Sequence, residues 1–238
     1  DFVQTGASLT ITTAGGSSSR PSDSTDAAST KGIKAGAQLV ISDGTDTITS
    51  SDDAVHSNDT VQIDGGTLKL STGDDAIHAD NALTTNGGTI DVTASYEGLE
   101  SNAITLNAAT INITSSDDGI NASDGSGEAD DPGAGSASNS TMVITGGAIT
   151  VDAGGDGLDS NGAMTISGGT IVVNGPTDSG NGALDTGGTL RISGGTLFAA
   201  GSSGMAESPD TDSSQAWLQS ELTASAGQSV TISTTDGT

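Results

Sequence analysis

The repeats SDDAVHSNDTVQIDGGTLKLST (residues 51–72) and GDDAIHADNALTTNGGTIDVTA (residues 73–94) decide the fold of this chain. Their acids recur 22 residues apart, and Glu97-Gly98-Leu99-Glu100 follows at the same interval. A fixed period of this length is typical of a solenoid, in which each repeat is one coil stacked on the coil before it. Equivalent residues of successive coils then form a column with about 4.8 Å between neighbours. The repeat therefore predicts a β-helix with a ladder of acidic side chains.

Aliphatic residues occupy four further columns, which we expect to line the interior. Each coil holds three short β segments, and the two core positions of the third segment lie two residues apart, as strand alternation requires. The first two columns are Ile33, Val55, Ile77, Leu99, Ile120, Leu158 and Leu184, closed by Met205, and Leu39, Val61, Leu83, Ile104, Met142, Met164 and Leu190. The other two are Leu68, Ile90, Ile111, Ile149, Ile171 and Leu197, and Leu70, Val92, Ile113, Val151, Val173 and Ala199. Diglycine turns such as Gly65-Gly66 precede the third segment, because glycine permits positive φ at corners.

These patterns predict an all-β fold, a single right-handed parallel β-helix of about 22 residues per coil. We expect one domain over residues 1–238: an N-terminal coil and loop over 1–29, regular coils over 30–205, and a capping segment over 206–238. The cap is expected to cover the open end of the solenoid, with Trp217 as an apolar plug and a closing strand near Val230 to Ile232.

Two stretches without a core pattern, residues 15–29 and 124–139, interrupt the coils. The second contains Asp124, Glu128, Asp130 and Asp131. It is either an exposed excursion or a loop on the binding face that adds a calcium ligand.

The composition excludes several classes of function. A formal charge of −26, from five Lys and Arg against 31 Asp and Glu, excludes nucleic acid as a natural partner. It also argues against adsorption to anionic membranes, and no apolar run reaches the roughly 20 residues that direct insertion into a membrane requires. The chain contains no cysteine, so disulfides do not stabilise it. It begins at Asp1 without a start methionine, which suggests a processed or trimmed product.

Three columns of mostly acidic residues predict a metal centre. One column is Asp53, Asp75, Glu97, Asp118 and Asp156, and its neighbour one residue earlier is Asp52, Asp74, Tyr96 and Asp117. Three residues further along each coil come His56, His78, Glu100, Asn121, Asp159 and Asp185. Calcium takes six to eight oxygen ligands in flexible geometry, and paired acids on successive coils supply such ligands. Transition metals are less favoured, because the chain offers two His and no Cys. The alternative is a solvated acidic edge that binds no metal. The predicted calcium ligands are Asp52, Asp53, Asp74, Asp75, Glu97, Glu100, Asp117, Asp118, Asp156 and Asp159.

Three further residues interrupt the acid columns and are candidates for ligand binding. His56 and His78 are one coil apart, so they form either a stabilising ladder or a contact to polysaccharide. Tyr96 is the only tyrosine, and it either stacks on a sugar ring or packs beside the ion site.

The ordered series of motifs resembles a known family. DDA(I/V)H…GGT is followed by Ser95-Tyr96-Glu97-Gly98-Leu99-Glu100 and by Asp117-Asp118-Gly119-Ile120-Asn121-Ala122, and related motifs continue at residues 180–185 and 201–207. Over roughly residues 30–210 the chain is similar to the bacterial carbohydrate-binding-domain family of secreted right-handed β-helix proteins. The resemblance implies a fold similar to calcium-dependent pectate lyases and binding to cellulose-like or acidic plant-wall polysaccharides without proven cleavage. The first coil departs from the family pattern, since Lys31 and Lys34 stand where acid and His recur later.

Catalysis is not expected. Eliminative cleavage of a uronic acid requires a base beside the calcium ion, and no Lys or Arg recurs next to the acids of residues 52–118. Lys34 comes closest, in the His56/His78 column, but its own coil lacks the acids. Glycosidase chemistry requires only two carboxylates, and no pair stands out among so many.

Two functions remain open, and both place the protein outside the cell, either secreted or at the cell surface. The first is a calcium-stabilised module that binds polysaccharide. The second is a structural subunit whose coils stack end to end into a filament, because a heterologous contact of this kind does not close. Lys31 and Lys34 give the first coil basic residues, so head-to-tail association would pair them with acids of the last coils. Alternatively, the two lysines only relieve repulsion within one coil.

Overall fold

The computed structural model describes residues 1–17, 29–124, 138–225 and 227–231. The predicted insertions therefore lie largely outside the described residues, as do Glu128, Asp130, Asp131 and Ile232. The described residues form 19 strands and no helix, so none of them belongs to a helix that could span a membrane. The strands are β1 (Phe2–Thr12), β2 (Ile33–Ala35), β3 (Gln38–Ser50), β4 (Val55–Ser57), β5 (Thr60–Ile63), β6 (Thr67–Thr72), β7 (Ile77–Thr85), β8 (Thr89–Ala94), β9 (Leu99–Leu106), β10 (Thr110–Ser115), β11 (Ile120–Ala122), β12 (Thr141–Ile144), β13 (Ala148–Ala153), β14 (Leu158–Ser160), β15 (Ala163–Ile166), β16 (Thr170–Asn174), β17 (Leu184–Thr186), β18 (Leu190–Ile192) and β19 (Thr196–Ala200).

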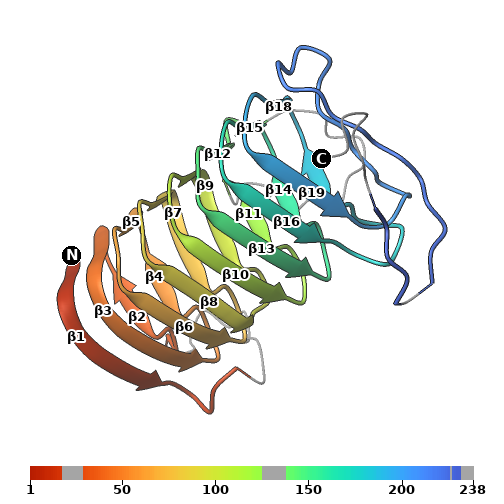
Figure 1. Ribbon diagram of the computed structural model, residues 1–238. Coiled ribbons are helices and arrows are strands. Elements are labelled where there is room, and N and C mark those ends of the chain that lie inside the picture. Colours follow the sequence, from red (N-terminus) through yellow and green to blue (C-terminus); the bar gives the residue numbers. More distant parts are fainter. Residues whose placement is uncertain (18–28, 125–137, 226, 232–238) are drawn as a thin grey trace.

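The strands pair in parallel from coil to coil and build a β-solenoid of about seven turns (Figure 1). One ladder consists of β2, β4, the start of β7, the start of β9, β11, β14 and β17. A second ladder runs from the start of β3 through β5, the ends of β7 and β9, and β12 to β15 and β18. The third runs from the end of β3 through β6, β8, β10, β13 and β16 to β19. The prediction of a single parallel β-helix is confirmed.

The predicted core columns are confirmed over the central coils. Ile33, Val55 and Ile77 are paired in register and buried, and the other columns pair as expected. One further core column was not predicted from the repeats. It comes two residues after the second core column and consists of Ile41, Ile63, Thr85, Leu106, Ile144, Ile166 and Ile192.

Diglycine turns set the corner before the third ladder. The second glycine of each pair has positive φ, between 84° and 94°, at Gly66, Gly88, Gly147, Gly169 and Gly195. L-residues with a Cβ rarely adopt this conformation, so these positions require glycine. The backbones also approach closely, since a Cβ on Gly88 would lie 2.8 Å from the carbonyl oxygen of Gly66 in the preceding coil.

The N-terminal end begins earlier than the predicted regular coils. β1 pairs along β3 from Phe2↔Leu39 to Thr12↔Thr49, so the segment before residue 30 already supplies part of a coil. In this first full coil Asp46 takes the core position of Leu68, and Gln4 donates a hydrogen bond of 2.8 Å to its Oδ1.

At the C-terminal end three predictions are wrong. Met205 is 49 % exposed and does not close the first core column. Trp217 is 43 % exposed and is not a buried plug, and no strand forms among the described residues after Ala200, so Val230 belongs to none. The segment attaches to the last coil by its backbone instead: Asp210 N donates to the Leu190 carbonyl and Gln215 N to that of Ile192. Backbone hydrogen bonds therefore cover the edge of β18, and Pro209 beside them is buried.

Candidate metal and ligand site

The acid columns lie at the corner that precedes the first ladder. Backbone hydrogen bonds of 3.0 to 3.1 Å, from Ala54 N to the Asp75 carbonyl, from Ala76 N to that of Glu97 and from Gly98 N to that of Asp118, hold this corner in register. Asp53, Asp75, Glu97, Asp118 and Asp156 therefore stack as predicted. In the neighbouring column, Tyr96 N bonds to Asp74 and Asp117 N to Tyr96 in the same manner.

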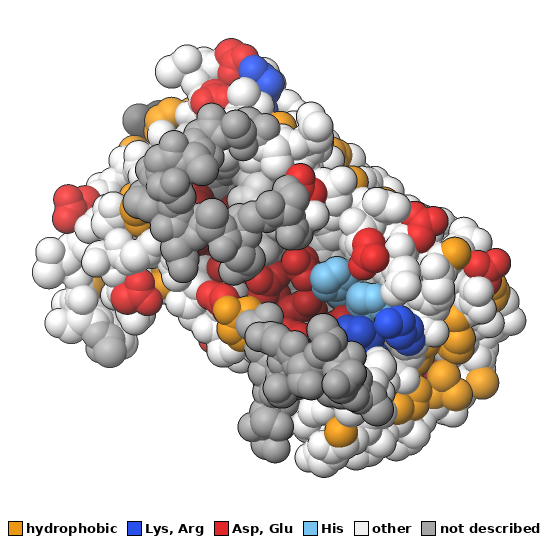
Figure 2. Space-filling model, turned by 180° about the vertical axis from the view of Figure 1, so that it is seen from behind, with side chains coloured by type: hydrophobic (Ala, Val, Ile, Leu, Met, Phe, Trp, Pro, Cys, Tyr) orange, Lys and Arg blue, Asp and Glu red, His pale blue; other side chains and the backbone are white. Residues whose placement is uncertain are grey.

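The column three residues further along is confirmed by strand register. His56 pairs with Lys34 before it and His78 after it, and the column continues through Glu100, Asn121, Asp159 and Asp185. Figure 2 shows acidic side chains gathered beside the two histidines on one face of the molecule. Tyr96, the third candidate for ligand binding, is half-buried in the column between Asp74 and Asp117.

In the N-terminal half of the site, the protein supplies its own cation. The Lys31 ammonium lies 2.7 Å from Asp52 Oδ1 and 2.5 Å from Asp53 Oδ2. Burial of Asp53 would raise the pKa of its carboxyl, but the hydrogen bond with His56 and the charge of Lys31 outweigh it and lower that pKa to about 2. Sequence reasoning placed Lys31 in the acid column but missed this contact. The ammonium turns toward acids of the next coil, which favours relief of repulsion in the ladder over a basic terminal surface for Lys31, whereas Lys34 is exposed.

In the coil after that of Asp53 and His56, His78 lies between two carboxylates. Its Nδ1 is 3.0 Å from Asp75 Oδ2 and 2.6 Å from Glu100 Oε2. Burial lowers the pKa of His78, but the hydrogen bonds to Asp75 and Glu100 raise it more, to about 11. His78 is therefore a cation at neutral pH. Burial of Glu100 would raise the pKa of its carboxyl, but the hydrogen bond with His78 outweighs burial and lowers that pKa.

The C-terminal half of the site has no such cation among its own residues. Between His78 and Arg191 the sequence contains no Lys, Arg or His, and Arg191 pairs with Asp212 at the surface. Burial, together with the charges of Asp75, Glu100 and Asp118, raises the pKa of Glu97 to about 10. Burial and three neighbouring acids likewise raise the pKa of Asp159 to about 8.

Asn121 stands out in this half because one of its polar atoms lacks a partner. Its Nδ2 donates to Glu97 Oε2 at 3.1 Å, while its Oδ1 is buried without a hydrogen bond among the described residues. The side chain is only 5 % exposed. A buried amide oxygen without a partner costs about 1–3 kcal/mol, so it calls for a ligand. Asn121 was predicted in the column but not as a metal ligand.

Gly155 keeps space open beside Asp117 and Asp118. A Cβ at this position would meet both Asp117 Oδ1 and Asp118 Oδ1. Asp118 Oδ1 also accepts a hydrogen bond of 2.7 Å from Asp156 N. The carboxylates of Asp117 and Asp118 thus lie beside a space that no side chain at position 155 fills.

Among the described residues, three groups bring three ligand atoms of His or acids within 4.8 Å of one another: Asp52 with Asp53 and Asp74, Asp53 with His56 and His78, and Asp75 with His78 and Glu100. All three lie in the half that also contains Lys31. Among the described residues beyond Glu100, no three such atoms lie within 4.8 Å of one another, as expected for like charges with no cation between them. In chemical terms, Lys31 and His78 offset part of the acid charge of the first half, where burial still raises the pKa of Asp75, and the second half offers oxygen ligands to a hard cation.

A stacked parallel β-helix with one such ladder along its length defines the class of this protein. A family model described as carbohydrate-binding domain-containing protein matches residues 1–76 and 75–238. The chain therefore belongs to this family, which fits carbohydrate binding on a β-helix and a binding rather than a catalytic role. The comparisons with curated proteins and with solved structures found no match.

Proposed function

We propose that the protein is an extracellular, calcium-stabilised β-helix that binds polysaccharide without cleaving it. The observation that supports this most strongly is the unequal division of the acid ladder. Lys31 and His78 neutralise its N-terminal half, whereas Glu97, Asp118 and Asp159 belong to coils whose sequence offers no basic residue.

Calcium fits the residues of the C-terminal half. It prefers carboxylate, amide and carbonyl oxygens in flexible geometry. Glu97 supplies a ligand from one coil, Asp118 and Asn121 Oδ1 supply ligands from the next coil, and Asp156 and Asp159 supply them from the coil after that. A divalent cation there stabilises the ionised forms of buried acids whose pKa values burial otherwise raises. It also satisfies the amide oxygen of Asn121.

Few residues that the structure describes could act as the base of a lyase. The Lys31 ammonium is held by Asp52 and Asp53, and Lys69 and Arg191 lie in the other two ladders. Glu97, whose raised pKa resembles that of a general acid, is only 6 % exposed and out of reach of a glycan chain. The remaining candidate is Lys34, which is exposed on β2.

The test is binding to polygalacturonate and to cellulose with calcium present, after chelation, and after calcium is restored. We expect binding that chelation abolishes and calcium restores, with no unsaturated product and no new reducing ends. Binding that is unchanged in excess chelator would contradict the calcium dependence. Product formation that disappears in a Lys34→Ala variant would show instead that the protein is a lyase.

A second candidate function, end-to-end self-association, has one observation in its favour. β1 is an 11-residue strand that pairs only with β3 among the described residues, and Val3 on it is 62 % exposed. A free edge of this length is a template for another strand. Sedimentation of the wild type against Val3→Lys tests this: a filament subunit loses its large species in the variant, whereas a wild type that stays monomeric with calcium contradicts the proposal.

A further inference from the structure

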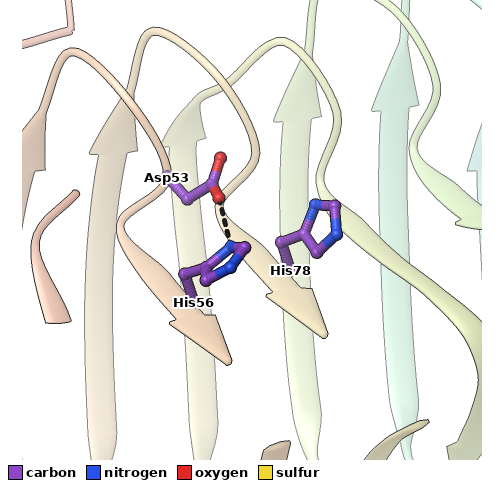
Figure 3. A group of neighbouring side chains, drawn as sticks. All are labelled: Asp53, His56 and His78. Atoms are coloured by element: carbon purple, nitrogen blue, oxygen red, sulfur yellow. Dashed lines mark hydrogen bonds and ion pairs between the residues drawn. The ribbon is translucent and has the colours of Figure 1, made fainter. Parts of the chain in front are cut away.

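The two histidines form a pair with a defined inner and outer side. His56 on β4 and His78 on β7 lie side by side in consecutive coils, with ring centroids 5.0 Å apart and planes tilted by 37° (Figure 3). On the inner side, His56 Nδ1 lies 2.7 Å from Asp53 Oδ2, and His78 Nδ1 lies 3.0 Å from Asp75 Oδ2. Glu100 Oε2 also lies 2.6 Å from His78 Nδ1. An ionised carboxylate only accepts hydrogen bonds, so beside Asp53 and Glu100 each Nδ1 carries the proton of its contact.

The outer nitrogens meet a different set of oxygens. Asp80 Oδ1 lies 3.5 Å from His78 Nε2 and 3.9 Å from His56 Nε2. Asn58 Oδ1 lies 3.0 Å from His56 Nε2. Asp80 and Asn58 are exposed, and a cavity of about 280 Å³ opens beside His78, Asp80 and Glu100. An ion from solvent can therefore reach His78 and Asp80 from the cavity and Asn58 at the surface.

We propose that His56 Nε2, His78 Nε2, Asp80 Oδ1 and Asn58 Oδ1 bind one divalent transition-metal ion of the zinc class. Tetrahedral zinc with bonds of about 2.0–2.1 Å separates neighbouring ligand atoms by about 3.4 Å. The separations from Asn58 to His56, from Asp80 to His78 and from Asp80 to His56, which are 3.0, 3.5 and 3.9 Å, bracket that value. Side-chain rotations that also bring the two Nε2 atoms together would place all four atoms in one ligand shell.

The inner carboxylates can orient the two histidines for metal binding. A metal-binding histidine commonly donates its other N–H to a carboxylate, which fixes the tautomer and orients the ring. Asp53 does this for His56, and Asp75 and Glu100 do it for His78. A divalent ion carries two charges, so the same acids attract it strongly.

This site is separate from the proposed calcium ligands Glu97 and Asn121 and does not depend on them. Imidazole nitrogen suits zinc, nickel and copper, whereas calcium selects oxygen. A bound ion would join β4 to β7 and act as a staple between consecutive coils.

Calorimetric titration with zinc, in excess calcium so that the oxygen sites are filled, tests the proposal. We expect saturable binding of one zinc ion per chain. Asp80→Asn and His56→Gln should each weaken the affinity by about ten-fold or more. Asp64→Asn is the matched control, because it removes an exposed carboxylate of the same coil at another corner, and it should leave the affinity unchanged.

Imidazole nitrogen NMR with zinc distinguishes the site from loose association with acids. We expect the Nε2 resonances of His56 and His78 to shift together, with Nδ1 still protonated. Asp80→Asn replaces only an exposed carboxylate by an amide and should fold normally, which circular dichroism checks. Zinc binding that is unchanged in Asp80→Asn, a metallated Nδ1, or no saturable binding would each overturn the proposal.

Discussion

At the scale of single residues, Lys31 shows how one side chain changes the meaning of an acidic repeat. Its ammonium lies beside Asp52 and Asp53, where the later coils have no basic residue in the column. The first rung of the ladder thus contains a built-in cation that satisfies a carboxylate only 2 % exposed.

Lys31→Met should therefore destabilise the protein by about 3–5 kcal/mol at pH 7, because the change leaves Asp53 buried and without its main cation. Urea unfolding measures the loss. Lys34→Met is the control, since Lys34 is exposed, and it should change the free energy of unfolding by less than about 0.5 kcal/mol. Equal effects of the two changes would contradict the role given to Lys31.

The sequence predicted which residues share a column, but not which of them touch. Column membership follows from strand alternation and coil length, so His56, His78 and Glu100 were placed correctly. Contacts depend on the reach of long side chains and on corner geometry. The sequence therefore did not predict three features. These are the ion pairs of Lys31, the position of Asp80 beside the Nε2 atoms of both histidines, and the buried Asn121 oxygen without a partner among the described residues.

At the scale of the element, the diglycine corner fixes the spacing between coils. Gly88 combines positive φ with close approach to the backbone of the preceding coil. Here the sequence was sufficient, because the Gly-Gly pairs recur at one place in the repeat.

Gly88→Ala should cost about 2 kcal/mol or more, because a left-handed conformation disfavours a Cβ and the backbone oxygen of Gly66 obstructs it. Gly36→Ala is the matched control: no atom lies within 4 Å of the added Cβ, and its φ is not in the strained range. Thermal unfolding of both variants measures the difference. A Gly88→Ala protein as stable as Gly36→Ala would show that the corner tolerates a side chain.

The two ends are the elements that the repeat predicted least well. A periodic pattern describes a coil with neighbours on both sides, and an end coil has only one. Asp46 in a core column at one end, and exposed Met205 and Trp217 at the other, follow no period. Their arrangement is set by local partners such as Gln4 and by the backbone contacts of residues 210–215.

At the scale of the whole molecule, the buried acids couple stability to pH and to metal. The pKa values of Glu97 and Asp159 are about 10 and about 8 in the folded protein, above the ordinary carboxyl range. A carboxyl with a raised folded pKa contributes stability that is complete below its unfolded pKa and is lost as the pH rises through the folded value.

In excess chelator the melting temperature should therefore fall between pH 5 and pH 9, by at least about 4 °C if the loss exceeds one or two kcal/mol. Calcium should reduce this fall, because it stabilises the ionised carboxylates. Glu97→Gln is the control and should flatten the profile in chelator, since it removes the group with the largest window. A melting temperature that stays level or rises with pH in chelator would contradict this assignment.

The most direct test of the account is a crystal structure of the calcium-loaded protein with anomalous scattering used to locate the ions. We expect calcium beside Asn121 Oδ1 and Glu97 and between the coils that contain Asp118, Asp156 and Asp159, with no calcium where the Lys31 ammonium meets Asp53. Calcium found only at Asp52, Asp53 and Asp74, with none beyond Glu100, would contradict the division of the ladder on which the proposed function rests.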